Sequence, residues 1–186
     1  CDLYFVERFR GLEEAGAYNA VFRLVEAVRL APAAVLAVMF PALCRAADAA
    51  PLSRLAARLG AAGVAVGAAT AWAAPVIVRL AYGDAYASAA PVLVMLSLAV
   101  PLLFVNYALT HQLIGWNGQR AYLQIVLAAL AANLALNLAL VPPYGMRGAA
   151  LGTIATELVV TAGCLVALAR RPGVAPLPRQ ASMEGA

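Results

Sequence analysis

Three features of the amino-acid sequence predict an all-α integral membrane protein. Of the 186 residues, 65% are hydrophobic and only 12% are charged, which is about half the charge of an ordinary soluble domain. Uncharged stretches of about 20 residues or more recur along the chain, and a helix of that length crosses the hydrocarbon core of a bilayer. Glycine and proline gather in the short segments between these stretches, where turns are expected. This composition excludes soluble enzymes, nucleic-acid-binding proteins and disordered chains.

The uncharged stretches place five full transmembrane helices and one partial helix in a single domain, residues 1–171. Residues 1–10 are interpreted as the end of a helix whose beginning is absent. The full helices are expected at about residues 17–43, 59–81, 89–114, 121–141 and 147–169. Prolines inside these spans predict kinks, because each proline removes a backbone hydrogen bond. Residues 172–186 are rich in proline and lack apolar periodicity, which predicts a disordered tail.

Arginine residues between the spans predict the orientation of the helices. Every basic residue is Arg, and one side of the membrane receives Arg45, Arg54, Arg58, Arg120, Arg170, Arg171 and Arg179. The other side receives Arg8, Arg10, Arg79 and Arg147. Because loops rich in positive charge stay in the cytoplasm, the C-terminus is predicted to be cytoplasmic. The chain starts at Cys1 without a charged segment followed by a short apolar stretch, so we expect no signal peptide here and interpret the chain as a fragment without its N-terminal part.

Three charged residues in the first half of the 17–43 helix form one polar stripe. Arg23, Glu26 and Arg29 fall within about 120° of one helix face, at a spacing that lets side chains pair. Charges at membrane depth cost about 2.5 to 3.5 kcal/mol each, so they face a bundle interior or a wet cavity. One interpretation is that the guanidinium groups bind an anionic substrate, since they suit phosphate. The other is a structural Arg-Glu-Arg triad, or arginines that extend to the membrane surface.

Glu157 lies near the middle of the last span, and Asn133 lies at a comparable depth on the preceding helix, with Asn137 one turn further along. A buried carboxylate at this depth can take up a proton or bind a coupling cation. Alternatively, Asn133 or Thr153 holds a protonated Glu157 as a packing contact between helices. Both interpretations, ion-coupling and structural, stay open for these residues and for Glu26.

The remaining polar residues offer no catalytic set. His111 is the single histidine, and it is interpreted either as a hydrogen-bond donor or as a proton relay. Cys1, Cys44 and Cys164 lack the spacing of a metal or redox site. The sequence contains no Ser/His/Asp set, no phosphate-binding glycine loop and no metal-ligand cluster. The protein is therefore predicted not to be an enzyme and to use no cofactor or metal.

Three segments carry a family resemblance. They are GAYNAVFRLVEAVRLAPAAVLAVMFPALCR at residues 16–45, YGDAYASAAPVLVMLSLAVPLLFVN at 82–106 and NLALNLALVPPYGMRGAALGTIATE at 133–157. The first resembles the eighth-helix signature of polysaccharide flippases in the multidrug/oligosaccharidyl-lipid/polysaccharide exporter superfamily, and the second also resembles this family. The third is the most specific, because it is similar to the Asn-x-x-x-Asn, Pro and Gly-x-x-Gly-Ala-Ala pattern of the last helical hairpin. The resemblance covers residues 1–171.

The resemblance implies a two-lobe protein of 12 to 14 helices, of which this chain is the C-terminal six-helix lobe. It implies a multi-pass protein of the bacterial inner membrane that flips polyprenyl-pyrophosphate-linked oligosaccharide for surface polysaccharide biosynthesis, including O-antigen. The implied partners are the lipid bilayer, the N-terminal lobe, polysaccharide polymerase and glycosyltransferases, and nucleic acid is not among them. By position, Arg23 and Glu26 match polar residues of the family's eighth helix, and Glu157 matches a frequent acid of the last helix. Arg29 departs from the usual aliphatic residue.

The expected mechanism is alternating access. Arg23 and Arg29 bind the pyrophosphate in a cavity between the lobes, while Glu26 or Glu157 changes its protonation or ion occupancy. Two alternatives stay open. The first is an ion-coupled multidrug extrusion transporter of the same superfamily, which a drug-accumulation assay separates from a flippase. The second is a non-transporting membrane scaffold of envelope assembly, which would tolerate neutralisation of these charged residues.

Overall fold

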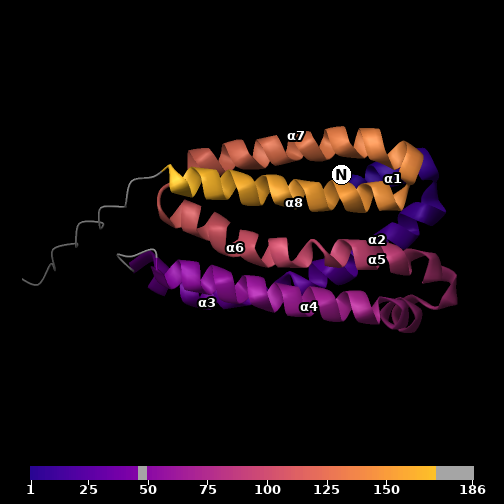
Figure 1. The fold of residues 1–186 in the computed structure, drawn as a ribbon. Helices are drawn as coiled ribbons and strands as arrows, with labels where there is room; N and C mark the ends of the chain where they lie inside the picture. Colours follow the sequence, from indigo (N-terminus) through magenta and orange to yellow (C-terminus); the bar gives the residue numbers. More distant parts are fainter. Residues whose placement is uncertain (46–49, 171–186) are drawn as a thin grey trace, which may run out of the picture.

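The structure is a computed structural model that describes the backbone of residues 1–45 and 50–170, and their side chains outside residues 40–52. Every described element is helical, and these ranges contain no strand (Figure 1). In chain order the elements are α1 (Asp2–Arg10), α2 (Leu12–Val28), α3 (Leu30–Arg45), α4 (Ala50–Tyr82), the 3-10 helix η1 (Asp84–Ala89), α5 (Ala90–Ser97), α6 (Val100–Gly115), α7 (Gln119–Tyr144) and α8 (Met146–Ala169). The tail expected at residues 172–186 lies outside the described residues.

Three helices in the described ranges are long and apolar enough to cross a membrane. They are α7, α8 and the Ser53–Tyr82 part of α4. The η1–α5 segment and α6 pass the same test together, bent by 43° at the break between them, and count as a fourth span if they form one unit. The prediction of an all-α membrane protein is therefore confirmed. The five full spans, the six-helix lobe and the side of the membrane that holds the C-terminus stay predictions.

The helix expected at residues 17–43 differs from the structure in two ways. It begins earlier, at Leu12, and it is divided at Arg29 into α2 and α3. Pro32 explains the division, because it has no N–H group to bond the carbonyl of Val28 one turn earlier. The side chain of Arg29 therefore projects from a break between two helices, and not from the middle of a regular one.

The helix expected at residues 89–114 is broken in the same way. α5 ends at Ser97 and α6 begins at Val100, since Pro101 has no N–H to bond the carbonyl of Ser97. The helix expected at 59–81 is longer than predicted, because it starts at Ala50. The last two helices, expected at 121–141 and 147–169, lie within α7 and α8.

The α5–α6 segment lies between the antiparallel α7–α8 pair and α4 (Figure 1). α1 packs against α7 and α8. α2 contacts α1 and α5, and α3 packs against α6. Gly145 closes the turn between α7 and α8 with a φ of +58°, a left-handed conformation that glycine adopts without strain. Chain segments that are far apart in the sequence thus meet in the middle of the bundle.

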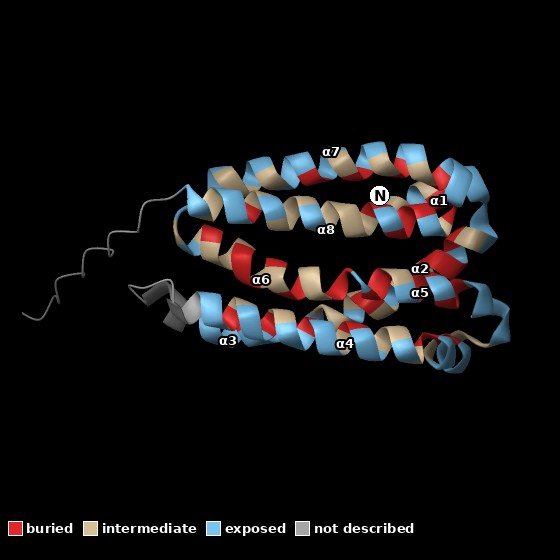
Figure 2. Cartoon of the chain, in the orientation of Figure 1, coloured by how far each residue is buried: buried red, intermediate tan, exposed pale blue. Residues whose placement is uncertain are grey.

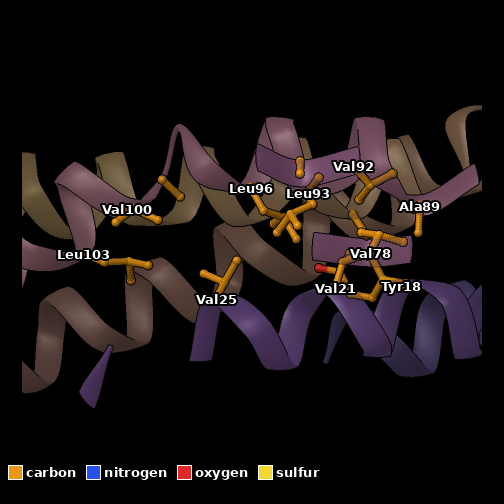
Figure 3. Close-up of a cluster of buried hydrophobic side chains, with 14 of the residues drawn as sticks. Tyr18, Val21, Val25, Val78, Ala89, Val92, Leu93, Leu96, Val100 and Leu103 are labelled. Atoms are coloured by element: carbon orange, nitrogen blue, oxygen red, sulfur yellow. The ribbon is translucent and has the colours of Figure 1, made fainter. Parts of the chain in front are cut away.

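A continuous core of buried apolar side chains joins α2, α4, α5 and α6. Figure 3 labels Tyr18, Val21, Val25, Val78, Ala89, Val92, Leu93, Leu96, Val100 and Leu103 in this core. The outer faces of α4, α7 and α8 carry exposed residues instead (Figure 2). Large apolar side chains are among them, including Trp72, which is 88% exposed. Such a surface suits contact with lipid tails, which is consistent with membrane-spanning helices.

Glycines on α4 let this helix approach the α5–α6 segment closely. A Cβ atom on Gly63 would lie 2.8 Å from the Cα of Pro101, and a Cβ atom on Gly67 would lie 2.7 Å from the carbonyl oxygen of Ser97. Both distances are too short for any side chain. Small residues at such contacts are the usual way in which membrane helices pack, since close approach maximises van der Waals contact.

We expect Gly67→Leu to separate α4 from the α5–α6 segment and to lower the free energy of unfolding by about 1 to 3 kcal/mol, the usual penalty of overpacking. Thermal unfolding in detergent, followed by size-exclusion chromatography, measures the effect. Gly16→Leu is the matched control, because nothing lies within 4 Å of a Cβ atom at that position. Equal unfolding temperatures for the two variants would contradict the proposed close packing.

Candidate functional site within the membrane helices

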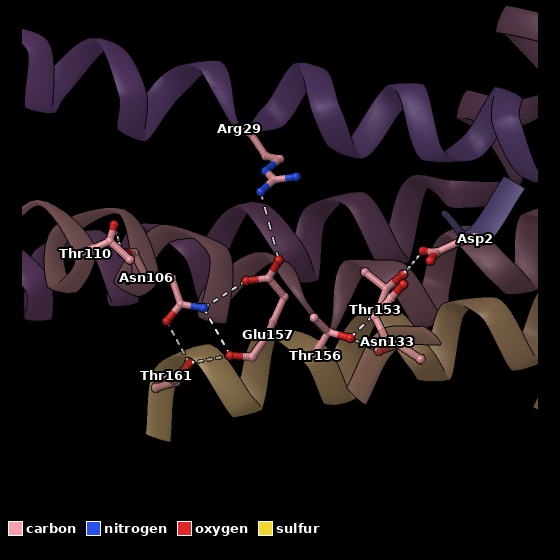
Figure 4. Close-up of polar contacts among 10 residues, drawn as sticks. Asp2, Arg29, Asn106, Thr110, Asn133, Thr153, Thr156, Glu157 and Thr161 are labelled. Atoms are coloured by element: carbon pink, nitrogen blue, oxygen red, sulfur yellow. Dashed lines mark hydrogen bonds and ion pairs between the residues drawn. The ribbon is translucent and has the colours of Figure 1, made fainter. Parts of the chain in front are cut away.

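A polar cluster surrounds Glu157, whose carboxylate is only 15% exposed. Asn106 of α6 donates a hydrogen bond from Nδ2 to Oε2 of Glu157 at 2.8 Å and a second one to its backbone oxygen at 3.1 Å. Nη2 of Arg29 lies 4.0 Å from Oε1 of the same carboxylate (Figure 4). Three elements that are distant in sequence, the α2–α3 break, α6 and α8, therefore converge on one acidic side chain.

The amide of Asn106 is held in one orientation from both ends. Its Oδ1 accepts a hydrogen bond from the hydroxyl of Thr161 at 2.8 Å, while its Nδ2 donates to Glu157 (Figure 4). Asn106 is 5% exposed, so an amide without these partners would be costly at this depth. The orientation of the amide presents a donor, and not an acceptor, to the carboxylate.

A cavity of about 290 Å³ opens beside this cluster. Polar and aromatic side chains line much of it, namely Arg29, Asn106, Tyr107, Thr110, His111, Tyr122 and Glu157. The Nδ1 atom of His111 lies 2.7 Å from the backbone oxygen of Tyr107, and the two rings stack. A cavity with a guanidinium group, a carboxylate and several hydroxyl groups can bind a polar or anionic group between apolar helices.

Arg23 and Glu26 lie apart from this cavity. They pair with each other at 3.1 Å between Nη1 and Oε2, with side chains that are 70% and 40% exposed. Both line a second, smaller cavity of about 190 Å³. The structural alternative of an Arg23–Glu26–Arg29 triad is therefore wrong, because Glu26 pairs with Arg23 whereas Arg29 approaches Glu157 of α8. Arg23 and Arg29 remain on the same segment of chain, about 9 Å apart along a helix axis.

A second buried polar cluster surrounds Asp2 of α1. Its Oδ2 accepts hydrogen bonds from the hydroxyl groups of Thr153 at 2.8 Å and Tyr18 at 3.2 Å. Its Oδ1 accepts one from Nδ2 of Asn137 at 2.9 Å. The donors come from α8, α2 and α7, so this single carboxylate ties four helices together. The sequence analysis missed Asp2, because nothing in the first ten residues indicates which helices α1 meets.

Asn133 and Asn137 belong to this second cluster and not to Glu157. Asn133 donates to Thr156 at 3.3 Å, and Asn137 donates to Asp2. The interpretation that Asn133 or Thr153 holds Glu157 is therefore wrong. The reason is that α8 lies between α7 and α6, and Glu157 points toward α6. The partner that it finds there, Asn106, was also missed, although it is the one amide in the middle of the expected 89–114 helix.

The Asp2 cluster contains an unpartnered acceptor. Oδ1 of Asn137 is buried and has no hydrogen-bond partner among the described residues, and a buried polar atom in this state requires an explanation. Carboxylate, amide and hydroxyl oxygens are ligands of hard cations. The single negative charge of Asp2 would balance the charge of one monovalent cation. Among the described residues, no group of three or more His, Cys, Asp or Glu side chains is suited to a metal ion.

We expect Asp2→Ala to lower the free energy of unfolding by about 1 to 3 kcal/mol, because three donors on different helices lose their shared acceptor. Unfolding of the protein in detergent micelles, by heat or by SDS titration, measures this loss. Glu7→Ala removes an exposed carboxylate from the same helix and serves as the control. If both alanine variants unfold alike, the Asp2 cluster does not hold the helices together.

Comparison with known proteins adds no relative to this description. No protein-family model, no curated protein sequence and no solved structure matches the chain. The two polar clusters and the helices that carry them are thus the basis of the functional proposal.

Proposed function

We propose that this chain is the C-terminal six-helix lobe of a two-lobe flippase of 12 to 14 helices, which moves polyprenyl-pyrophosphate-linked oligosaccharide across the bacterial inner membrane. The observation that supports it most is the position of Arg29, Asn106 and Glu157 around a cavity in a bundle of membrane helices. Charged groups at this depth are costly and commonly mark a substrate or ion pathway. The cavity would take the pyrophosphate, while the lipid tail stays in the bilayer.

The long contact between Arg29 and Glu157 leaves the guanidinium group available. At 4.0 Å, the pair is held less tightly than a hydrogen-bonded ion pair. A guanidinium group has five N–H donors in a planar arrangement that fits two phosphate oxygens. A pyrophosphate entering the cavity would therefore replace Glu157 as the partner of Arg29. Arg23, exposed on the preceding turns of the same segment, would supply a second guanidinium group on the route to the cavity.

The break at Arg29 supports alternating access. Arg29 occupies the joint between α2 and α3, where a backbone hydrogen bond is lost to Pro32. Binding of an anion by Arg29, and release of Glu157, would change the contact between this joint and α8. Broken helices next to a central site are a recurring device of transporters, because the two halves can change their angle. In this proposal the C-terminus is cytoplasmic, as the distribution of Arg indicates.

The Asp2 cluster is our proposed site for a monovalent coupling cation. Asp2, Asn137, Thr153 and Tyr18 provide oxygen atoms from α1, α7, α8 and α2, including the unpartnered Oδ1 of Asn137. These residues would coordinate the cation and so link α1, α2, α7 and α8. Glu26 suits this role less well, because its exposed carboxylate already pairs with Arg23.

We expect Arg29→Ala in the complete two-lobe protein to slow flipping of a labelled polyprenyl-pyrophosphate-linked sugar by about 10- to 100-fold, the loss of one charge-assisted contact of 1.5 to 3 kcal/mol. Arg29→Lys should restore part of the rate, because it keeps the charge without the planar donors. Proteoliposomes with a reagent that reaches only outer-leaflet sugars provide the measurement.

Arg79→Ala is the matched control for this experiment. Arg79 pairs with Asp84 at the end of α4, where both side chains are more than 70% exposed. The Arg79→Ala variant should therefore flip the substrate at the same rate as the unaltered protein. Flipping by Arg29→Ala at the same rate as the control would remove Arg29 from the mechanism. Flipping of drugs instead of the glycolipid would favour the multidrug transporter.

We also expect the flipping rate to depend on Na⁺ through Asp2. Replacing Na⁺ with a large organic cation should slow the unaltered protein severalfold, and Asp2→Asn should be slow in both solutions, because its amide carries no charge to balance a cation. Glu7→Gln, a change of an exposed acid on α1, should keep the dependence. Equal rates with and without Na⁺ for the unaltered protein would refute sodium coupling at Asp2.

A further inference from the structure

The outer face of the α7–α8 pair carries a groove of about 680 Å³ that the proposed transport route does not use. Five small residues, Ala121, Ala128, Ala162, Gly163 and Ala167, form much of its lining, and Arg170 lies at one end. Val166, also in the groove, is about 180° around α8 from Glu157. The groove thus lies on the face of α8 opposite Glu157, between α8 and α7, which run side by side in Figure 1.

Close approach of the two helices forms the floor of the groove. A Cβ atom on Gly163 of α8 would lie 3.0 Å from the side chain of Ile125 on α7. Above this contact, alanine side chains leave room that larger residues would fill. Elsewhere on the same helices the outer face carries large side chains, such as Leu123, Leu127 and Leu165, each more than half exposed.

The length and position of the groove match one leaflet of a bilayer. From Val159 to Arg170, α8 rises about 16 Å, which is about half of a hydrocarbon core of roughly 30 Å. The groove begins next to the middle of the 24-residue α8 and ends at the residue that follows its last turn. With α8 across a bilayer, Arg170 would lie at the depth of the lipid phosphates, and the apolar part of the groove would lie at the depth of one acyl chain.

We propose that this groove binds an anionic glycerophospholipid of the surrounding bilayer, with an acyl chain along the small residues and its phosphate at Arg170. Three features favour this occupant: the apolar lining, the length of one leaflet and a cationic group at the membrane surface. Basic residues beside grooves between membrane helices attract anionic headgroups, and a guanidinium group suits phosphate oxygens. The bound lipid would brace the α7–α8 pair, which carries Asn137, Thr153 and Glu157.

Native mass spectrometry of the protein in detergent, titrated with phosphatidylglycerol or phosphatidylcholine, tests the proposal. Phosphatidylglycerol should bind more tightly, and Arg170→Ala should weaken it by about fivefold, the effect of one cation near the headgroup. Arg170→Lys should keep most of the preference. Ala162→Leu should weaken both lipids by filling the groove, whereas Ala135→Leu, an exposed position of α7 outside the groove, should change neither.

Arg120→Ala is the matched control for charge, because Arg120 is exposed at the same end of the α7–α8 pair but does not line the groove. Equal binding of the two lipids, or an equal loss in Arg120→Ala and Arg170→Ala, would overturn the proposal. So would competition by inorganic phosphate alone, or a dimer that forms through the groove in place of a lipid complex. This lipid can bind the groove whether or not the protein flips the glycolipid, so the lipid-binding measurement is independent of the proposed transport function.

Discussion

The need to satisfy polar groups in a medium without water shapes this bundle. Water does not solvate side chains at membrane depth, so each carboxylate, amide and hydroxyl group must find a partner in the protein. Glu157 finds Asn106 on α6, and Asp2 finds donors on α2, α7 and α8. These contacts decide which helices are neighbours, because apolar surfaces pack against lipid tails as readily as against each other.

The two helix breaks follow from a second constraint, the missing N–H group of proline. Pro32 and Pro101 each leave a carbonyl without its usual donor, and the chain bends by 43° at the break before α6. The first break places Arg29 where its side chain extends across to α8. The backbone is still helical up to Arg29, because its N–H bonds the carbonyl of Val25. A guanidinium group at the end of α2 thus lies next to a buried acid of α8.

The α7–α8 pair has two faces of different chemistry. Its inner face carries Asn137, Thr153 and Glu157, which contact α1 and α6. Its outer face carries the groove that small residues line and that ends at Arg170. A change in the packing of this pair would therefore move both polar clusters together. This connection gives a physical route by which an ion at Asp2, an anion at Arg29 and a lipid on the outer face influence one another.

The sequence by itself determined the all-α membrane class, the approximate bounds of α7 and α8, and the place of Glu157 near the middle of α8, because these depend on composition and spacing along a helix. Only the tertiary structure decided the partners of the polar residues. Glu157 bonds a residue 51 positions away, and Thr153 bonds one 151 positions away. Helical periodicity shows which face of a helix is polar, but it does not show which helix lies opposite that face. That choice depends on the polar contacts between helices, on the packing of small residues and on the two breaks.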